Sequence, residues 1–272
     1  MRAVVCVKQV IDIDPRAPGF SIVLDQVGKR IEGAAGSRPL INGFDEQALE
    51  AALRIREQLG ELEVIALSVG ARFNHDVMKR ALAAGADDLV LVQDASLDTW
   101  DSRHIGVSLA AAIRYLGGAD IVLCGRQASD WDNALVPFVL AEELGMACLS
   151  LAKQVTVNGD EVEVERVLAD GAQVVSATLP AVVTVTSELG MLRYPTVLAK
   201  LAAARRQARH LGLADIGVPA EHVPAVQVVG LAFPDGGREC RFVEAADGVE
   251  AGRRLAGILL DPGKVHLGGG AF

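Results

Sequence analysis

The chain reads Cys124-Gly-Arg-Gln-Ala-Ser-Asp-Trp-Asp-Asn-Ala-Leu-Val136 directly after an apolar run at residues 121–123 and before an apolar helical pattern. The apolar run predicts a strand, and the small, polar residues after it predict a turn that leads into a helix. Such a turn leaves backbone N–H groups unpaired at the positive end of a helix dipole, where a phosphate group binds well. The stretch therefore predicts a nucleotide site.

Strands and helices alternate along the first half of the chain around this stretch. Apolar runs at residues 3–7, 63–69 and 89–92 predict further strands, the first of them buried on both faces. The alternation indicates an α/β fold with a doubly wound, mostly parallel sheet, which binds ligands at the carboxyl ends of its strands. Apolar residues at helical spacing predict helices over residues 42–60, from the turn at 70–74 to about 84, and over 101–116 and 133–144.

The remaining segments are less regular. Residues 8–39 form a polar, Gly-rich excursion with two alternating pieces, which predicts an irregular hairpin-like loop of a length that is usually functional. The β-rich segments between residues 150 and 187, with the hairpin signal Asn158-Gly159, predict an antiparallel edge of the sheet. We expect a nucleotide-binding α/β domain over residues 1–210, ending with a helix at 198–208. An extended C-terminal arm over residues 211–272 should contain a helix at 248–260.

Composition restricts the possible partners. The chain has 272 residues, 51% of them apolar, and a formal charge of −9, which argues against nucleic acid or an anionic membrane as the main partner. No apolar stretch reaches the roughly 18–20 residues of a membrane span. Cysteines without CxxC spacing predict buried thiols, and with them a cytoplasmic protein. These cysteines are Cys6, Cys124, Cys148 and Cys240.

Three other loops should meet the Cys124–Val136 stretch at the carboxyl ends of the strands. They are Cys6-Val-Lys8, Asn42-Gly-Phe-Asp45 and Ser68-Val-Gly70. Gly43, Gly70 and Gly125 would let the backbone approach a ligand closely, although they could equally be ordinary turn glycines.

No catalytic acid or metal site is predicted. Asp45 is expected to cap the helix at 42–60, and Asp130 and Asp132 to form turns or accept hydrogen bonds, because no His or third carboxylate lies near them. His75 and His104 are expected on polar helix faces, and no histidine pair has metal-ligand spacing. The motifs of serine hydrolases, metalloproteases, P-loop proteins and Rossmann dehydrogenases are absent.

Several motifs in the same order resemble the beta subunit of electron transfer flavoproteins over residues 2–210, and more loosely to 260. Asn42-Gly-Phe-Asp-Glu-Gln-Ala-Leu-Glu50 is similar to the family's N-P-F-D-E-x-A-L-E, and Gly125-Arg-Gln-Ala-Ser-Asp-Trp-Asp132 is similar to G-[KR]-Q-A-x-D-x-D. Further matches are Val4-Val-Cys-Val-Lys-Gln-Val-Ile-Asp12, Ala81-Leu-Ala-Ala-Gly-Ala-Asp87, Leu179-Pro-Ala-Val-Val-Thr184 and Arg193-Tyr-Pro195.

The resemblance implies an adenine nucleotide alpha hydrolase-like fold and a heterodimer whose alpha subunit carries an electron-transferring FAD. This subunit would hold AMP or, in the electron-bifurcating branch, a second FAD that meets NADH. The implied cofactor contacts are Cys6, Asn42, Phe44, Asp45, Val69, Gly125, Arg126, Gln127, Ala128, Ser129, Asp130, Trp131, Asp132, Asn133, Ala134, Leu135 and Val136.

The resemblance also implies protein partners. Residues 188–199, here called the docking segment, correspond to the element that anchors partner flavin dehydrogenases of the acyl-CoA dehydrogenase class, through Arg193, Tyr194 and Val197. The electrons would pass to a quinone or ferredoxin-type acceptor. The arm after Leu211 is similar to the longer, bifurcating-type beta subunits and would pack on the alpha subunit.

The sequence departs from the family within its own signature. The Gln that both branches usually place near residues 133–135 is missing, Trp131 replaces a small or acidic residue, and Gly43 replaces Pro. The choice between AMP and FAD therefore stays open. We also hypothesise that the Arg126 cation tunes a bound flavin. Three functions compete: a simple carrier with AMP, a bifurcating subunit with a second FAD, and a stand-alone adenine-nucleotide sensor.

Overall fold

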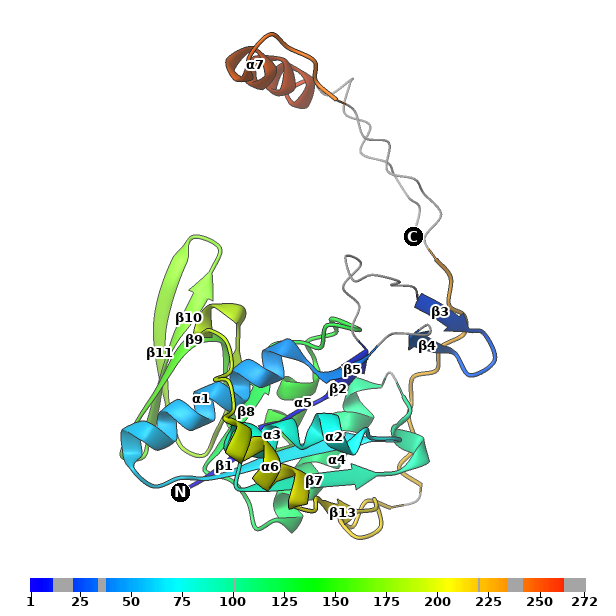
Figure 1. Ribbon diagram of the computed structural model, residues 1–272, viewed down its shortest axis with the longest axis vertical. Coiled ribbons are helices and arrows are strands. Elements are labelled where there is room, and N and C mark those ends of the chain that lie inside the picture. The colour runs from blue at the N-terminus through cyan, green and yellow to red at the C-terminus, as the bar shows by residue number, and fades with distance from the viewer. Residues whose placement is uncertain (12–21, 34–37, 100, 220, 234–241, 262–272) are drawn as a thin grey trace. The chain divides into compact units, whose positions relative to one another are not determined.

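In the part of the chain that the structure describes, nine strands form one sheet in the order β11-β10-β9-β12-β8-β1-β6-β7-β13 (Figure 1). The computed structural model describes residues 1–11, 22–33, 38–99, 101–219, 221–233 and 242–261. The strands of the sheet are β1 Arg2–Cys6, β6 Glu63–Gly70, β7 Asp88–Gln93, β8 Ile121–Gly125, β9 Ala147–Asn158, β10 Glu161–Leu168, β11 Gly171–Thr178, β12 Ala181–Val185 and β13 Arg209–Leu211.

The centre of the sheet is parallel, which confirms the predicted fold class. Strand β1 lies between β8 and β6, with Val4 opposite Val122 on one side and Ile65 on the other. The pairs β6–β7, β8–β12 and β7–β13 are also parallel. Every residue of β8 and β12 is buried, because helices cover both faces of a parallel sheet.

The predicted antiparallel edge is correct for three strands and wrong for the fourth. Strands β9, β10 and β11 pair antiparallel, and Gly159 and Asp160 connect β9 to β10, one position later than the predicted Asn158-Gly159, because Asn158 is the last residue of β9 and pairs with Glu161. Strand β12 instead inserts parallel between β8 and β9, where its unbroken apolar run is covered on both faces. The edge strand β13 was not predicted, because it is short and carries the exposed Arg209 and His210.

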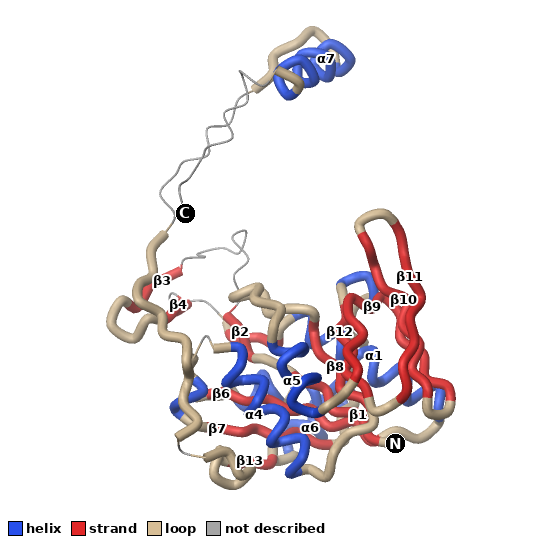
Figure 2. The backbone as a smooth tube through the Cα atoms, turned by 180° about the vertical axis from the view of Figure 1, so that it is seen from behind, coloured by secondary structure: helices blue, strands red, loops and turns tan. Residues whose placement is uncertain are grey.

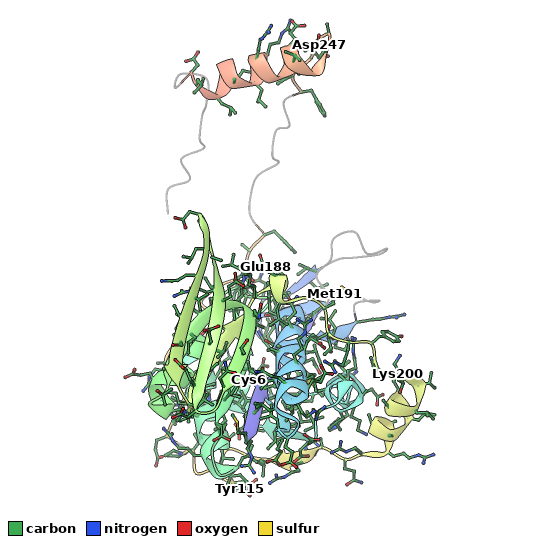
Figure 3. The ribbon with its side chains drawn as sticks, turned by 90° about the vertical axis from the view of Figure 1, so that its left-hand side faces the viewer. Cys6, Tyr115, Glu188, Met191, Lys200 and Asp247 are labelled. Atoms are coloured by element: carbon green, nitrogen blue, oxygen red, sulfur yellow. The ribbon has the colours of Figure 1, made fainter. Side chains whose placement is uncertain are left out.

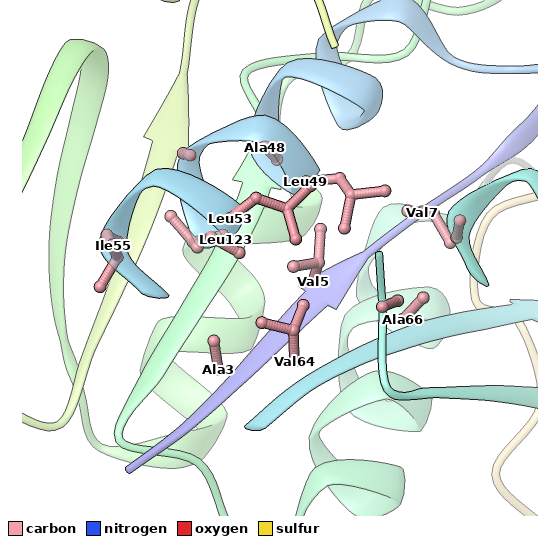
Figure 4. Close-up of a cluster of buried hydrophobic side chains, with 14 of the residues drawn as sticks. Ala3, Val5, Val7, Ala48, Leu49, Leu53, Ile55, Val64, Ala66 and Leu123 are labelled. Carbon is pink, nitrogen blue, oxygen red and sulfur yellow. The ribbon is translucent and has the colours of Figure 1, made fainter. Parts of the chain in front are cut away.

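The helices cover the two faces of the sheet in separate layers. Leu49 and Leu53 of α1 pack over Val5 of β1 and Leu123 of β8 in one apolar core (Figure 4). A second apolar core lies under α4 and α5 on the opposite face of the sheet. Figure 2, turned by 180° from Figure 1, shows the helices on this face. The helices are α1 Gly43–Leu59, α2 His75–Met78, α3 Arg80–Ala84, α4 Ser102–Tyr115, α5 Val136–Leu144, α6 Val197–Arg205 and α7 Gly248–Leu259, with short 3₁₀ turns η1 Ala95–Leu97 and η2 Ser187–Leu189.

Several helix boundaries differ from the predicted ones. Helix α5 begins at Val136 rather than residue 133, because Asp132 and Ala134 have positive φ angles that a helix does not allow. The helix predicted between the turn at residues 70–74 and Ala84 does begin after Asn74, whose side chain caps α2, but it is divided into the two short helices α2 and α3. Helix α6 ends at Arg205, so Arg205, Arg206 and Arg209 do not share one helix face.

Two small antiparallel strand pairs lie among the described residues between Lys8 and Ile41. Strand β2 Gln9–Ile11 pairs with β5 Pro39–Ile41, and β3 Ile22–Asp25 pairs with β4 Arg30–Gly33. The second pair, here called the β3–β4 hairpin, confirms the predicted hairpin-like character of this segment. Residue 21, where the first alternating piece was expected to begin, lies outside the described residues.

The chain divides into a unit of residues 1–231 and a unit of residues 232–272. Leu213, Ile216 and Val218, which follow residue 210, are buried in the second core and belong to the first unit. In the second unit, Asp247 caps α7 by accepting a hydrogen bond from the Glu250 N–H (2.8 Å). No helix in the described part of the chain has the length and apolar character needed to cross a membrane.

Candidate functional site

A cavity of about 500 Å³ opens at the carboxyl ends of β1, β6 and β8. The four loops expected to converge do meet there; Cys6, at the end of β1, is labelled in Figure 3. Thirteen of the predicted contact residues line the cavity: Cys6, Asn42, Asp45, Val69, Gly125, Gln127, Ala128, Asp130, Trp131, Asn133, Ala134, Leu135 and Val136. Four others, Phe44, Arg126, Ser129 and Asp132, are close in sequence but are not part of this lining.

Asn42 fixes the loop between β8 and α5, residues 126–135, here called the β8–α5 loop. Its amide nitrogen donates to the Gln127 carbonyl (2.9 Å), and its amide oxygen accepts from the Ser129 N–H (3.1 Å). The Asn42 N–H donates to the Lys8 carbonyl (2.9 Å), so the loops after β1 and β8 share one anchor. Because Asn42 is buried, both hydrogen bonds of its side chain are protected from water.

Asp45, one turn further along α1, joins the same loops. Contrary to expectation, it does not cap the helix. Its carboxylate accepts from the N–H groups of Lys8 (2.8 Å) and Gly125 (3.1 Å), because the first turn of α1 points it at the strand ends. Burial raises the pKa of Asp45 to about 7, although both N–H donors act in the opposite direction. A Cβ on Gly125 would lie 2.4 Å from the Asp45 carboxylate, so this close approach requires glycine.

The carboxylates of the β8–α5 loop have partners within the protein. Lys8 donates to both oxygens of Asp130 at 2.7 and 2.8 Å, at the rim of the cavity. Asp132 accepts from the Gln127 side chain (2.7 Å). Among the described residues, no group of three or more His, Cys, Asp or Glu side chains could hold a metal ion.

Arg126 lies on the Phe44 ring rather than against the cavity. Its guanidinium carbon is 5.1 Å from the ring centroid, a cation–π contact, and its backbone N–H donates to the Val185 carbonyl (3.0 Å). Arg126 is not among the residues that line the cavity, so the cavity lining does not support the hypothesis that its cation tunes a bound flavin.

Cys6 and Cys124 are buried neighbours on β1 and β8, and both line the cavity. The side-chain hydrogen bond between Cys124 and Cys6, which stabilises the neutral Cys124 thiol, raises the pKa of Cys124 together with burial. A thiol held in its neutral form is a poor nucleophile, so these side chains contribute an apolar, polarizable wall. The predicted buried thiols are confirmed at these two positions; Cys148 is half-buried, and Cys240 lies outside the described residues.

Two cavity walls were missed by the sequence reasoning. One is the β3–β4 hairpin, and the other is the segment from η1 to the first turns of α4. The only sequence signal for the first was the unusual length of the 8–39 excursion. The additional lining residues of these walls are Arg30, Ile31, Glu32, Gly33, Leu97, Asp98, Thr99, Ser102, Ile105 and Leu109.

The docking segment lies apart from the cavity and exposes apolar side chains. Tyr194 is 86% exposed and Val197 72% exposed, with Met191, Leu198 and Leu201 also exposed. Figure 3 labels Glu188, Met191 and Lys200 along this segment and the helix that follows. Arg193 is not free: it pairs with Glu50 and Glu57 of α1, and both carboxylates raise its pKa above the ordinary value.

A family model and curated relatives of this chain belong to the same family. A family model described as "Electron transfer flavoprotein domain" matches residues 35–210. The chain is 35% identical over 222 residues to the electron transfer flavoprotein subunit beta of Megasphaera elsdenii, covering 79% of this chain and 80% of that protein. It is 31% identical over 188 residues to the subunit of the same name from Mycobacterium tuberculosis strain H37Rv, covering 68% and 71%.

A third relative carries a different name. The chain is 33% identical over 202 residues to the "Caffeyl-CoA reductase-Etf complex subunit CarD" of Acetobacterium woodii, covering 72% of each protein. Residues 35–210, which the family model matches, include strands β6 to β12, the β8–α5 loop and the docking segment, and begin after β1. The chain therefore belongs to the electron transfer flavoprotein family, and within it to the beta subunits.

Proposed function

We propose that the cavity binds the AMP portion of an adenine nucleotide, either AMP itself or the AMP half of FAD, in a heterodimer with an electron transfer flavoprotein alpha subunit. The observation that carries this proposal is the start of α5. Leu135 at its N-cap makes no side-chain capping hydrogen bond, and residues 133–137 line the cavity. Pro137 in the first turn has no N–H, and the Phe138 N–H donates to the Leu135 carbonyl (3.1 Å), so the start of α5 offers a phosphate group the Val136 N–H and the positive end of the helix dipole.

The remaining walls suit a base and a ribose. Val69, Ile105, Leu109 and the two buried thiols provide apolar surface for a planar ring, while Lys8 and Asp130 at the rim provide polar partners. A volume of about 500 Å³ is typical of small-molecule sites. When a flavin is bound in the complex, it supplies the electron-transfer chemistry, and the residues of this chain hold and orient the nucleotide.

A second FAD remains the alternative ligand, and one observation favours it. The cavity continues past the core loops to the β3–β4 hairpin and to the start of α4, which gives it walls beyond those that converge on the start of α5. With a second FAD, the protein would act as the bifurcating type that oxidises NADH. We also propose that the docking segment contacts partner flavin dehydrogenases through Tyr194 and Val197.

The test is to co-express the chain with its alpha subunit, purify the complex, denature it and quantify released FAD and AMP. One FAD plus one AMP per heterodimer supports the simple carrier, and two FAD support the bifurcating type. A complex with no nucleotide beyond the alpha-subunit FAD overturns the proposal.

The assignment of this nucleotide to the cavity has its own test. Asn42→Ala should lower the second nucleotide well below one per heterodimer, because the β8–α5 loop loses its anchor. The control is Asn158→Ala in the β9–β10 hairpin, which should retain the nucleotide.

A further inference from the structure

Residues 212–219 and 221–231, here called the strap, run from β13 to the β3–β4 hairpin, as Figures 1 and 2 both show, and contact the start of α4 on the way. The strap has no regular secondary structure, yet it is anchored at its start. Leu213, Ile216 and Val218 are buried in the second core, which also contains Leu97 and Leu109 of the cavity wall. The strap is therefore part of the folded unit that builds the cavity.

Asp101 joins the strap to the start of α4. One carboxylate oxygen caps the helix by accepting from the N–H groups of Arg103 (2.9 Å) and His104 (3.3 Å). The other oxygen accepts from the strap N–H groups of Ala225 (2.7 Å) and Val226 (3.3 Å). Asp101 is 4% exposed, so each of its oxygens is committed to backbone donors away from water.

A stacked histidine pair forms the second attachment. The His222 ring of the strap lies on the His104 ring of α4, with centroids 4.9 Å apart and planes tilted by 22°. His104 is 1% exposed, and its Nε2 lies 3.4 Å from the Ser96 hydroxyl of η1. The stack thus connects the strap to α4 and, through Ser96, to η1.

The far end of the strap reaches the opposite cavity wall. The Gln26 side chain in the turn of the β3–β4 hairpin donates to the Leu231 carbonyl (2.7 Å). The same hairpin bonds across to the η1–α4 wall, where Arg30 donates to Asp98 (2.9 Å). Arg30 and Asp98 both line the cavity.

We propose that the strap holds the two outer walls of the cavity in place, with Asp101 and His222 as positioning residues for nucleotide binding. This rests on the proposed nucleotide site. The strap binds the η1–α4 wall through Asp101 and His104 and the hairpin wall through Gln26. If the strap is released, both walls spend less time in the binding-ready arrangement, and the apparent affinity falls with the populated fraction.

Nucleotide titration of the full-length chain gives the first readout. AMP and FAD are the probes, each added separately and followed by calorimetry. We expect His222→Ala to weaken binding by about 10-fold, the value for a tenfold drop in the competent fraction. His222→Phe, which keeps a ring that can stack on His104, should bind the probes with the wild-type affinity. The control is His210→Ala, because His210 forms a similar ring contact with His75 (5.0 Å) on the exposed surface.

Hydrogen exchange gives the second readout. In His222→Ala, residues 22–33 of the hairpin should exchange faster although the His222 ring stacks on His104 of α4, outside the hairpin, an effect that a purely local role would not produce. Asp101→Asn should act in the same direction, because its amide can keep the α4 cap while it presents an NH₂ group to the Ala225 and Val226 donors. If His222→Ala folds poorly, Asp101→Asn still tests whether the strap holds the cavity walls.

The outcomes separate the two proposals. If the wild-type chain binds neither probe, the proposed nucleotide site fails, while hydrogen exchange still tests the attachment of the walls. If the wild type binds, an unchanged affinity or an unchanged hairpin exchange in both variants overturns the role of the strap. Failure of His222→Phe to restore binding overturns the assignment to ring stacking.

Discussion

Glu50 of α1 and Arg193 of the docking segment lie 143 positions apart in the sequence and form an ion pair at 3.0 Å. The Glu50 carboxylate also accepts from the Arg193 backbone N–H and from Arg54, which itself donates to the Leu189 carbonyl (2.8 Å). Helix α1 thus anchors the docking segment two turns after Asn42 and Asp45 at its start, which line the cavity. The two family motifs that contain Glu50 and Arg193 are in direct contact.

Substitution of Glu50 should destabilise the protein. Glu50→Gln removes a carboxylate that is 7% exposed and leaves Arg193 without its main partner. We expect a loss of about 2 kcal/mol, below the usual cost of breaking a buried pair because the Arg193 side chain is 34% exposed. Chemical denaturation measures this loss. Glu57→Gln is the matched control, since Glu57 also pairs with Arg193 but is 62% exposed, and an equal loss in both variants would contradict the argument.

Gly125 should tolerate no side chain. In Gly125→Ala the new Cβ would lie 2.6 Å from the Phe44 Cβ and 2.8 Å from the Phe44 backbone carbon, so α1 must move away from β8. We expect a loss of about 1–3 kcal/mol in the free energy of unfolding and a lower nucleotide content of the purified complex. Gly43→Ala is the control, because nothing lies within 4 Å of its Cβ position, and it should be neutral or stabilising. Normal stability of Gly125→Ala would refute this packing argument.

Much of the sheet could be predicted because its strands carry their own signal. The strands β1, β6, β7 and β8 are apolar runs that helices cover on both faces, and their burial appears directly in the residue types. Strand β12 has the same kind of run, but its neighbours are chosen by long-range packing. Its place between β8 and β9 could not be derived from local periodicity.

The site was predicted as a set of loops, and its hydrogen bonds were not. Asp45 was identified, yet its true partner Gly125 is 80 positions away, and only the folded chain brings the two together. His104 was expected on a polar helix face, but it is buried under the strap, because the packing of residues 221–226 on α4 has no periodic signature. The outer cavity walls were missed for the same reason.

Ala134 should be replaceable by glycine at little cost. Its φ of 55° lies in the left-handed region, which costs a non-glycine residue roughly 1–2 kcal/mol. Glycine removes that cost, although it also makes the unfolded chain more flexible. We expect Ala134→Gly to be neutral or stabilising and Ala128→Gly, in the same loop but without a positive φ, to be less stable by about 1 kcal/mol. Thermal unfolding of the two variants should show this order, and the reverse order would exclude strain at Ala134.

The buried His104 should make stability depend on pH. Burial lowers the pKa of His104 below its ordinary value of 6.5, His222 acts in the same direction, and Asp101 and Asp94 act against it. As the pH falls through about 6.5, the unfolded chain therefore takes up a proton before the folded chain does. The contribution of His104 to stability is complete above this pH and is lost below it.

The measurement is the melting temperature between pH 5 and pH 8. The wild type should lose stability toward pH 5, and His104→Phe, which keeps a stacked ring but binds no proton, should lose less over the same range. His210→Gln is the control, because this ring is exposed and its replacement should leave the wild-type pH dependence in place. The His104–His222 stack also attaches the strap. The protection of residues 221–226 against hydrogen exchange, corrected for the intrinsic exchange rate at each pH, should therefore fall toward pH 5 as well. An equal decline of the melting temperature in the wild type and His104→Phe would show that other groups control acid stability.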